Sequence, residues 1–165
     1  MISIITVYLL EKQEYVRKQK QPDVRSQAVP LTRISIPACL PPHKARALAD
    51  AVHEGLVETC NVPSRDRFQL ISTYAPDMML IDPTFPDVRR TPEASIVEIL
   101  FLEGRTIEQK TRLFRCIADR AMQAGFAGDD IMVTLTENKP TDWSAGNGRS
   151  YGDRPEAVGT SRRSR

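Results

Sequence analysis

The sequence predicts an α+β fold made of α/β-type β-α-β units: two tandem repeats that form one four-stranded sheet, with two helices on one face. The prediction rests on a pattern that occurs twice and on the geometry that this pattern requires. Residues 30–36 and residues 95–101 are both short β-type runs, and each precedes a turn, a long amphipathic helix and a second β-type run. A strand-helix-strand unit with a helix of this length forms a right-handed parallel crossover, so each repeat supplies half of the sheet.

The two helices are predicted from their start signals and their apolar periodicity. The first runs from Pro41 to Cys60 and opens with two prolines, which suit a first turn that needs no amide donors. The second runs from Thr106 to Ala124, because Thr106 and Gln109 have the spacing of a capping box. The predicted buried stripes are Ala45, Leu48, Ala49, Val52 and Leu56 in the first helix, and Leu113, Phe114, Ile117, Ala121 and Met122 in the second.

Four β-type runs are predicted as strands: Leu31–Ile36, Phe68–Tyr74, Ile96–Leu102 and Ile131–Thr136. The third run is nearly all apolar, which is typical of a strand that is buried on both faces. Because two helices cover one face only, the other face would leave a large apolar patch, and this predicts an obligate oligomer. The proline-rich segment 75–92 is expected to contain a hairpin through residues 79–81 and to form the rim of a site.

Composition divides the chain into three zones. Residues 1–29 are interpreted as an extension without sustained periodicity, residues 30–148 as the folded domain, and residues 149–165 as a disordered basic tail. The formal net charge is +2, and the excess of basic residues lies in the two ends, whereas the middle is mildly acidic. A nucleic-acid binder usually carries a basic face on its folded part, so no nucleic-acid partner is expected.

The cysteine and histidine content and the short apolar start favour a cytoplasmic protein that has no metal site and no membrane partner. Three cysteines without C-x-x-C spacing and two histidines predict neither a disulfide framework nor a metal site, and they favour a reducing compartment. The apolar opening is too short to span a bilayer. His43 and His53 are expected to be solvated helix residues. Asp129 and Asp130 are adjacent, so their side chains are expected to point apart in a turn.

Four segments resemble the tautomerase superfamily, whose β-α-β units begin with a catalytic proline that has a free amine. Residues 101–110 (FLEGRTIEQK) are similar to the strand end and helix start of 4-oxalocrotonate tautomerase, and residues 30–36 resemble a family amino terminus. Residues 62–69 and 142–148 resemble the malonate semialdehyde decarboxylase branch. The resemblance implies the tautomerase fold, a homotrimer, a small keto-acid substrate, and neither a metal nor an organic cofactor.

Carried over residue by residue, the resemblance implies four site residues. Pro30 matches the catalytic proline, Asp66 the active-site aspartate, and Arg105 a substrate-binding arginine that also stabilises charge in the reaction. Trp143 matches a tryptophan near the pocket wall. The same residues have plainer interpretations: a proline that opens a strand, a turn or capping aspartate, a surface arginine and a packing tryptophan.

Two positions depart from the branch. Glu103 stands where the branch has a second arginine, and Ala145 stands where it has a larger aromatic residue. These departures weigh more against decarboxylation of malonate semialdehyde than against keto-enol chemistry. Three functions therefore remain open: an isomerase of the tautomerase type, a decarboxylase or hydratase, and a non-enzymatic trimeric interaction protein whose proline is blocked.

The proline chemistry requires a free amine at Pro30. A chain-terminal amine has a pKa of about 7.7 to 8.0, and burial or a nearby cation lowers it, so a terminal proline beside Arg105 would be neutral and able to accept a proton. An amide nitrogen inside the chain is no base. The expectation is therefore that residues 1–29 are absent from the working protein, with Val29 at the position of a bacterial start codon.

Overall fold

The computed structural model describes residues 30–153, so the extension 1–29 and residues 154–165 of the expected tail lie outside the described residues. The main elements are β1 (Leu31–Pro37), α2 (Pro42–Cys60), β2 (Phe68–Tyr74), β3 (Ser95–Leu102), α3 (Ile107–Gln123) and β4 (Ile131–Asn138). Three short 3-10 helices complete them: η2 (Gly128–Asp130), η3 (Pro140–Asp142) and η4 (Tyr151–Asp153). Residues 149–153, the first part of the expected tail, thus end in a turn of 3-10 helix.

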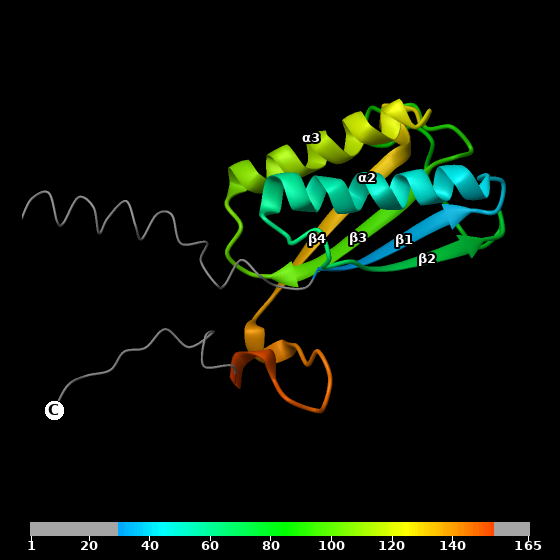
Figure 1. The fold of residues 1–165 in the computed structure, drawn as a ribbon. Helices are drawn as coiled ribbons and strands as arrows, with labels where there is room; N and C mark the ends of the chain where they lie inside the picture. Colours follow the sequence, from blue (N-terminus) through cyan, green and yellow to red (C-terminus); the bar gives the residue numbers. More distant parts are fainter. Residues whose placement is uncertain (1–29, 154–165) are drawn as a thin grey trace, which may run out of the picture.

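The sheet has the strand order β2-β1-β3-β4, and both helices lie on one of its faces (Figure 1). β1 pairs parallel with β2, and β3 pairs parallel with β4, as two right-handed crossovers require. The two central strands β1 and β3 are antiparallel. The predicted tandem β-α-β repeats, four-stranded sheet and helices on one face are therefore confirmed, and the two repeats run in opposite directions across the middle of the sheet.

The hydrophobic core lies between the helices and the sheet. Alternate residues of β1 and β3 point into it, and the predicted stripe of α2 is buried as expected. The stripe of α3 is narrower than predicted, because only Leu113, Ile117 and Ala121 are buried. Phe114 and Met122 are 40% and 48% exposed, so their assignment to the core was wrong. They lie one residue further round the helix than the row that packs against α2.

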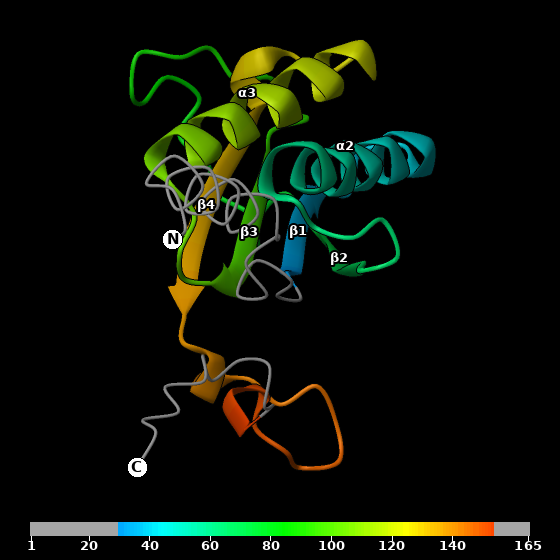
Figure 2. The ribbon, with the colours of Figure 1, turned by 60° about the vertical axis from the view of Figure 1, so that its left-hand side comes forward.

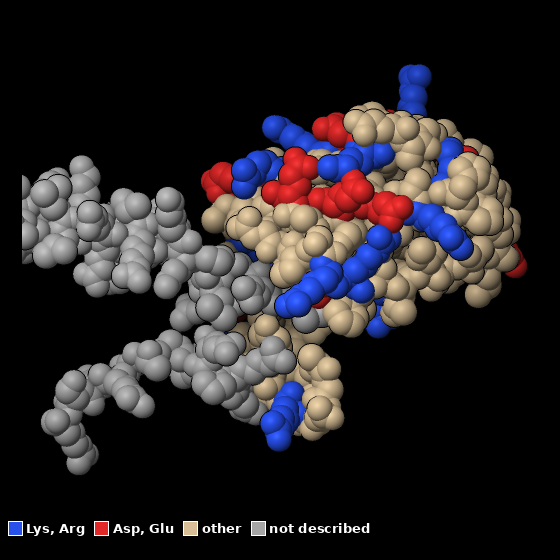
Figure 3. Space-filling view, in the orientation of Figure 1, with Lys and Arg blue, Asp and Glu red and all other residues tan. Residues whose placement is uncertain are grey.

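The helix ends follow the sequence closely. Thr106 is the N-cap of α3, and it exchanges two hydrogen bonds with Gln109 in a capping box, which confirms that prediction. Pro41 is the N-cap of α2, and the helix begins at Pro42. On the outer helical surface, acidic and basic side chains alternate (Figure 3), and Arg120 of α3 forms ion pairs with Glu54 and Glu58 of α2.

The segment between β2 and β3 differs from its prediction. It contains turns rather than a hairpin, and Asp82 orders it by accepting hydrogen bonds from the backbone N–H groups of Thr84 and Phe85. It joins the end of β2 to the start of β3, which both lie at the end of the sheet opposite to Pro30. Within one chain, this segment therefore does not border the edge where Pro30 lies, and its role as the rim of a site stays a prediction.

The sheet face away from the helices carries apolar side chains that a single chain leaves exposed. Phe68, Leu70 and Tyr74 of β2 and Met132 of β4 are all more than a third exposed, and strand register places them on this face. An uncovered apolar face of this kind marks an interaction surface. Among residues 30–153, no helix is both long enough and apolar enough to cross a membrane.

Candidate active site

Strand directions bring three of the four predicted site residues to one end of the sheet. Pro30 directly precedes β1, Asp66 lies two residues before β2, and Arg105 lies three residues after β3. Because β1 and β2 are parallel and β3 is antiparallel to β1, the starts of β1 and β2 meet the end of β3. Residues distant in the sequence therefore converge on one edge of the sheet, beside the end of α2 and the start of α3 (Figure 1).

Pro30 is buried at this edge. The register that pairs Leu31 with Leu100 puts Pro30 opposite Phe101, the residue after Leu100 on β3. Phe101 is fully buried and belongs to the hydrophobic core. A nitrogen at position 30 consequently lies next to apolar surface, where the neutral form of an amine is favoured over the charged form.

Arg105 is the most unusual charged residue of this edge, since only 9% of it is exposed. Its Nη1 donates to the Leu102 carbonyl, and the guanidinium lies 4.6 Å from the centroid of the Phe101 ring. Gly104 makes the turn possible with a φ of +117°, a region that favours glycine. The Phe101 ring therefore has Arg105 stacked on it, while Pro30, just before β1, lies opposite Phe101 in the strand register.

The second terminal nitrogen of Arg105, Nη2, is buried and has no hydrogen-bond partner among the described residues. Burial lowers the pKa of Arg105, whereas the neighbouring Cys60 and Glu137 raise it. Buried polar groups without a partner are rare in folded proteins, and an unpaired guanidinium nitrogen is the donor that a carboxylate accepts best. This nitrogen can donate a hydrogen bond to an anion at this edge of the sheet.

Asp66 occupies the turn between α2 and β2. Its backbone N–H donates to the Pro63 carbonyl at 2.8 Å, which closes the turn. The carboxyl group is half-buried, and this burial raises its pKa, while the charges of His53 and Arg65 oppose the rise. Such a group can hold a proton at a higher pH than an ordinary aspartate, which suits a residue that orients or returns a proton.

Trp143 lies in the segment that follows β4. Its backbone N–H donates to the Pro140 carbonyl, and its carbonyl accepts from the N–H of Tyr151 at 2.7 Å, which closes residues 140–153 into a compact loop. This loop leaves the same edge of the sheet but extends away beyond it (Figures 1 and 2). The indole Nε1 of Trp143 is buried and has no hydrogen-bond partner among residues 30–153. Within one chain, the structure does not bring Trp143 onto the Arg105 guanidinium.

Some residues of this edge were not predicted from the sequence. Phe101 and Cys60 surround the Arg105 guanidinium, but both are apolar core positions and carried no functional signal. Asn138, the last residue of β4, has a buried Oδ1 without a partner among the described residues. His53 is only 9% exposed and hydrogen-bonds to the Ser64 carbonyl, so its assignment as a solvated residue was wrong. His43 is exposed, as expected.

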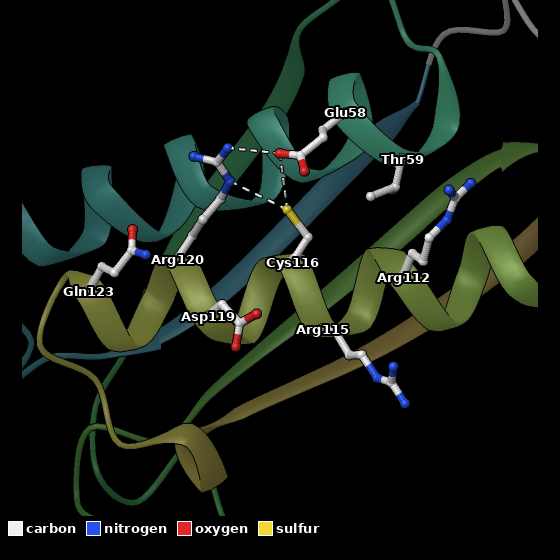
Figure 4. A pocket seen from close by; sticks show the side chains of 8 residues that line it. All are labelled: Glu58, Thr59, Arg112, Arg115, Cys116, Asp119, Arg120 and Gln123. Atoms are coloured by element: carbon white, nitrogen blue, oxygen red, sulfur yellow. Dashed lines mark hydrogen bonds and ion pairs between the residues drawn. The ribbon is translucent and has the colours of Figure 1, made fainter.

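A hollow lies on the outer surface between α2 and α3, away from this edge (Figure 4). Arg120 and Glu58 line it and bind each other, and Cys116 lies between them, accepting a hydrogen bond from Nε of Arg120 at 3.4 Å. The paired charges of this hollow join the two helices, and none of the four predicted site residues lines it. The sheet edge is therefore the better candidate for an active site.

No group of three or more His, Cys, Asp or Glu side chains suited to a metal ion lies within residues 30–153. The adjacent pair Asp129 and Asp130 points in two directions, as expected. Asp129 accepts from the backbone N–H of Arg89, whereas Asp130 accepts from Thr91.

Comparisons with known proteins agree on one family. A family model described as a tautomerase enzyme matches residues 66–146. The probable tautomerase YusQ of Bacillus subtilis is 36% identical over 104 residues, which is 62% of this chain and 82% of YusQ. The probable tautomerase YrdN of the same organism is 28% identical, over 74% of this chain and 95% of YrdN.

Solved structures give the same result. The FG41 malonate semialdehyde decarboxylase inhibited by 3-bromopropiolate is 38% identical, with a TM-score of 0.68 over 74% of this chain and 92% of its own. A fused 4-oxalocrotonate tautomerase described as a symmetric trimer is 23% identical, with a TM-score of 0.61 over 73% of this chain and 95% of its own, and it shows the shared fold.

Proposed function

The chain belongs to the tautomerase family, and we propose that it is a cofactor-independent keto-enol tautomerase of a small 2-keto or enol carboxylate. In this proposal, Pro30 is the amino-terminal residue of the working protein and its free amine is the general base. The observation that carries the proposal is the buried Arg105 nitrogen without a partner, which lies at the same sheet edge as Pro30.

Each site residue has a role in the proposed reaction. The Pro30 nitrogen accepts the proton of the enol hydroxyl and delivers it to C3, while the 2-oxygen becomes a carbonyl. The rigid ring fixes the direction of the nitrogen lone pair. Arg105 holds the substrate carboxylate through Nη2, because its Nη1 is already used by the Leu102 carbonyl. Asp66, whose pKa is raised by burial, orients the hydroxyl group or returns a proton.

The buried position of residue 30 supports the role of base. An amine beside the Phe101 ring and close to a cation has a pKa below its ordinary value, because both surroundings disfavour the ammonium form. The base is then neutral near physiological pH. The same argument requires residues 1–29 to be absent, since a peptide nitrogen at Pro30 cannot accept a proton.

A lyase of the malonate semialdehyde decarboxylase type is the second candidate, favoured by the 38% identity to the FG41 enzyme. In that reaction, a protonated or imine-forming Pro30 would polarise the carbonyl of a β-keto acid. Borohydride separates the two candidates: an imine between Pro30 and substrate is reduced to a stable adduct, whereas proton transfer leaves no adduct. A mass increase on Pro30 would favour the lyase.

We also propose that the working form is a homotrimer and that Trp143 acts on a neighbouring copy. The open sheet face with Phe68, Leu70 and Tyr74 would be covered in such an assembly. The segment that carries Trp143 extends away from its own sheet, which suits contact with a second chain (Figure 2). In this arrangement the segment that carries Trp143 lies beside the carboxylate bound at the neighbour's Arg105.

Two measurements test the proposed function. The intact mass of the protein expressed from its own gene context shows whether the chain begins at Pro30. Ketonisation of phenylpyruvate enol, followed by the loss of enol absorbance, then shows whether that form is a tautomerase. A chain that begins at Pro30 and ketonises the enol supports the proposal. A native chain that begins at Met1, with no turnover before or after trimming to Pro30, supports a non-enzymatic trimer instead.

A further inference from the structure

His53 is a buried histidine on α2 that faces the turn carrying Asp66. Its Nε2 lies 2.9 Å from the Ser64 carbonyl oxygen, two residues before Asp66. Because a carbonyl can only accept, Nε2 carries the hydrogen and donates it. The contact joins the middle of α2 to a turn that is closed by a backbone hydrogen bond from Asp66 to Pro63.

The same side of α2 holds the other end of the turn. Asp50 forms an ion pair with Arg67 at 2.6 Å, and Nε2 of Gln69 donates to the Ala49 carbonyl at 2.8 Å. These contacts fix the chain just after Asp66, whereas His53 fixes it just before. The turn that carries Asp66 is therefore attached to one helix on both of its sides.

The bond between His53 and Ser64 satisfies the buried Nε2 donor of His53. Ser64 itself is exposed, so its carbonyl does not depend on the imidazole for a partner. For the turn, the main consequence of the bond is therefore its direction. Core positions are usually occupied by apolar residues, as the preceding position on the same helix is by Val52.

We propose that His53 is a positioning residue, which acts through the Ser64 carbonyl to hold the Asp66 carboxyl toward the sheet edge where Pro30 and Arg105 lie. The proposal rests on the proposed function for the role of Asp66 in turnover, but the placement of Asp66 can be tested without turnover. The charges of His53 and Arg65 both act on the Asp66 carboxyl, and the Asp50–Arg67 pair lies about one helical turn from His53.

Three variants separate positioning from stability. His53→Gln keeps an N–H donor at the place of Nε2 but carries no positive charge. His53→Ala removes both the donor and the ring. His43→Ala is the matched control, since His43 is an exposed histidine on the same helix.

The first readout is the carboxyl titration of Asp66 by NMR in the full chain, together with the hydrogen exchange of its backbone N–H. The charge of His53 lowers the pKa of Asp66, so both His53 variants should raise it, and His43→Ala should not. Exchange of the Asp66 N–H should be about tenfold faster in His53→Ala only, because its turn is no longer held. An unchanged titration and unchanged exchange in His53→Ala would overturn the proposal.

The second readout is the ketonisation of phenylpyruvate enol by the amino-terminal form that turns over. His53→Ala should lower kcat about tenfold with KM changed less than about twofold, because a misplaced proton-transfer group affects the reaction step. His53→Gln should recover most of kcat. Equal kcat losses in both variants would contradict positioning through the donor. If the wild-type chain shows no turnover, the proposed function fails, and the Asp66 titration and exchange still decide the role of His53.

Discussion

The two ends of the sheet are related by the tandem repeat, yet they differ in how their polar groups are satisfied. At one end, Pro30 opens β1 and Asp66 precedes β2; at the other, Ser95 opens β3 and Asp130 precedes β4. Asp130 is 1% exposed, and both of its oxygens accept hydrogen bonds from Thr91. Asp66 is half-buried, and its pKa is raised by that burial.

The two ends also differ in how the donors of the basic side chain near each end are paired. At the Ser95 end, Lys44 binds Glu93 and the Gly125 carbonyl. At the Pro30 end, Arg105 keeps a buried nitrogen without a partner among the described residues. One end thus uses its polar groups to hold the segment between β2 and β3, whereas the other leaves one buried donor unsatisfied within residues 30–153. A buried polar group without a partner costs free energy, and such costs are typical of functional sites.

The largest expected effect concerns Arg105. Arg105→Gln should lower kcat/KM for phenylpyruvate enol by about 10²- to 10³-fold, because it removes the charge that binds the carboxylate and stabilises the developing enolate. Steady-state kinetics measures the loss. Arg112→Gln is the control, since Arg112 is an exposed arginine on α3, and it should change kcat/KM less than about twofold. Similar losses in both variants would contradict a specific role for Arg105.

A mixed trimer tests whether Trp143 acts on a neighbour. Trp143→Ala and Pro30→Ala should each be nearly inactive alone, with losses of about tenfold or more. Refolding them together should restore part of the activity, because a Trp143→Ala subunit keeps its proline and receives tryptophan from a Pro30→Ala neighbour. Mixtures as inactive as the separate variants would show that both residues act within one chain.

At the opposite end, Asp130 should matter for stability and not for turnover. Asp130→Ala removes the acceptor of two hydrogen bonds from Thr91 and should lower the free energy of unfolding by about 2 to 3 kcal/mol. Urea denaturation measures this loss. Asp129→Ala removes one exposed contact with Arg89, and should cost less than about 1 kcal/mol. A loss of kcat in Asp130→Ala under conditions where it is folded would contradict the division between the two ends.

The smallest effect concerns Asp66 and pH. Burial raises the pKa of Asp66, so the native state favours the neutral carboxyl, and this contribution to stability is present at low pH and lost as pH rises through the folded pKa. Asp66→Asn should therefore be more stable than wild type at pH 7 and equal to it near pH 3. The gain should stay below about 1 kcal/mol, because solvent screens a half-buried group. Thermal unfolding at both pH values measures it; a variant less stable at pH 7 would contradict the sign.

Local signals in the sequence predicted the elements well. The capping box at Thr106 and the apolar steps of α2 are set by neighbours within one or two helical turns, and both were confirmed. Predictions of side-chain burial that depend on distant neighbours failed at some positions. Whether Phe114 is buried depends on where α2 lies, and the role of His53 depends on a turn eleven residues away. No local pattern encodes either contact.

The candidate site was reached by a different route. Pro30, Asp66 and Arg105 were named through a family resemblance, and strand directions then brought them to one edge of the sheet. The unpaired Nη2 of Arg105 could not be predicted, because it results from stacking on Phe101 and from a single backbone contact at Leu102. Such a feature exists only once the chain has folded.

The most direct test of the central claim compares two chains that differ by one residue. One begins at Pro30, and the other begins at Val29 and so converts the Pro30 amine into an amide while leaving every side chain of the site in place. If Pro30 is the base, the added residue should lower kcat for phenylpyruvate enol by about 10²- to 10⁴-fold. Equal turnover by the two chains would contradict a catalytic amine at Pro30.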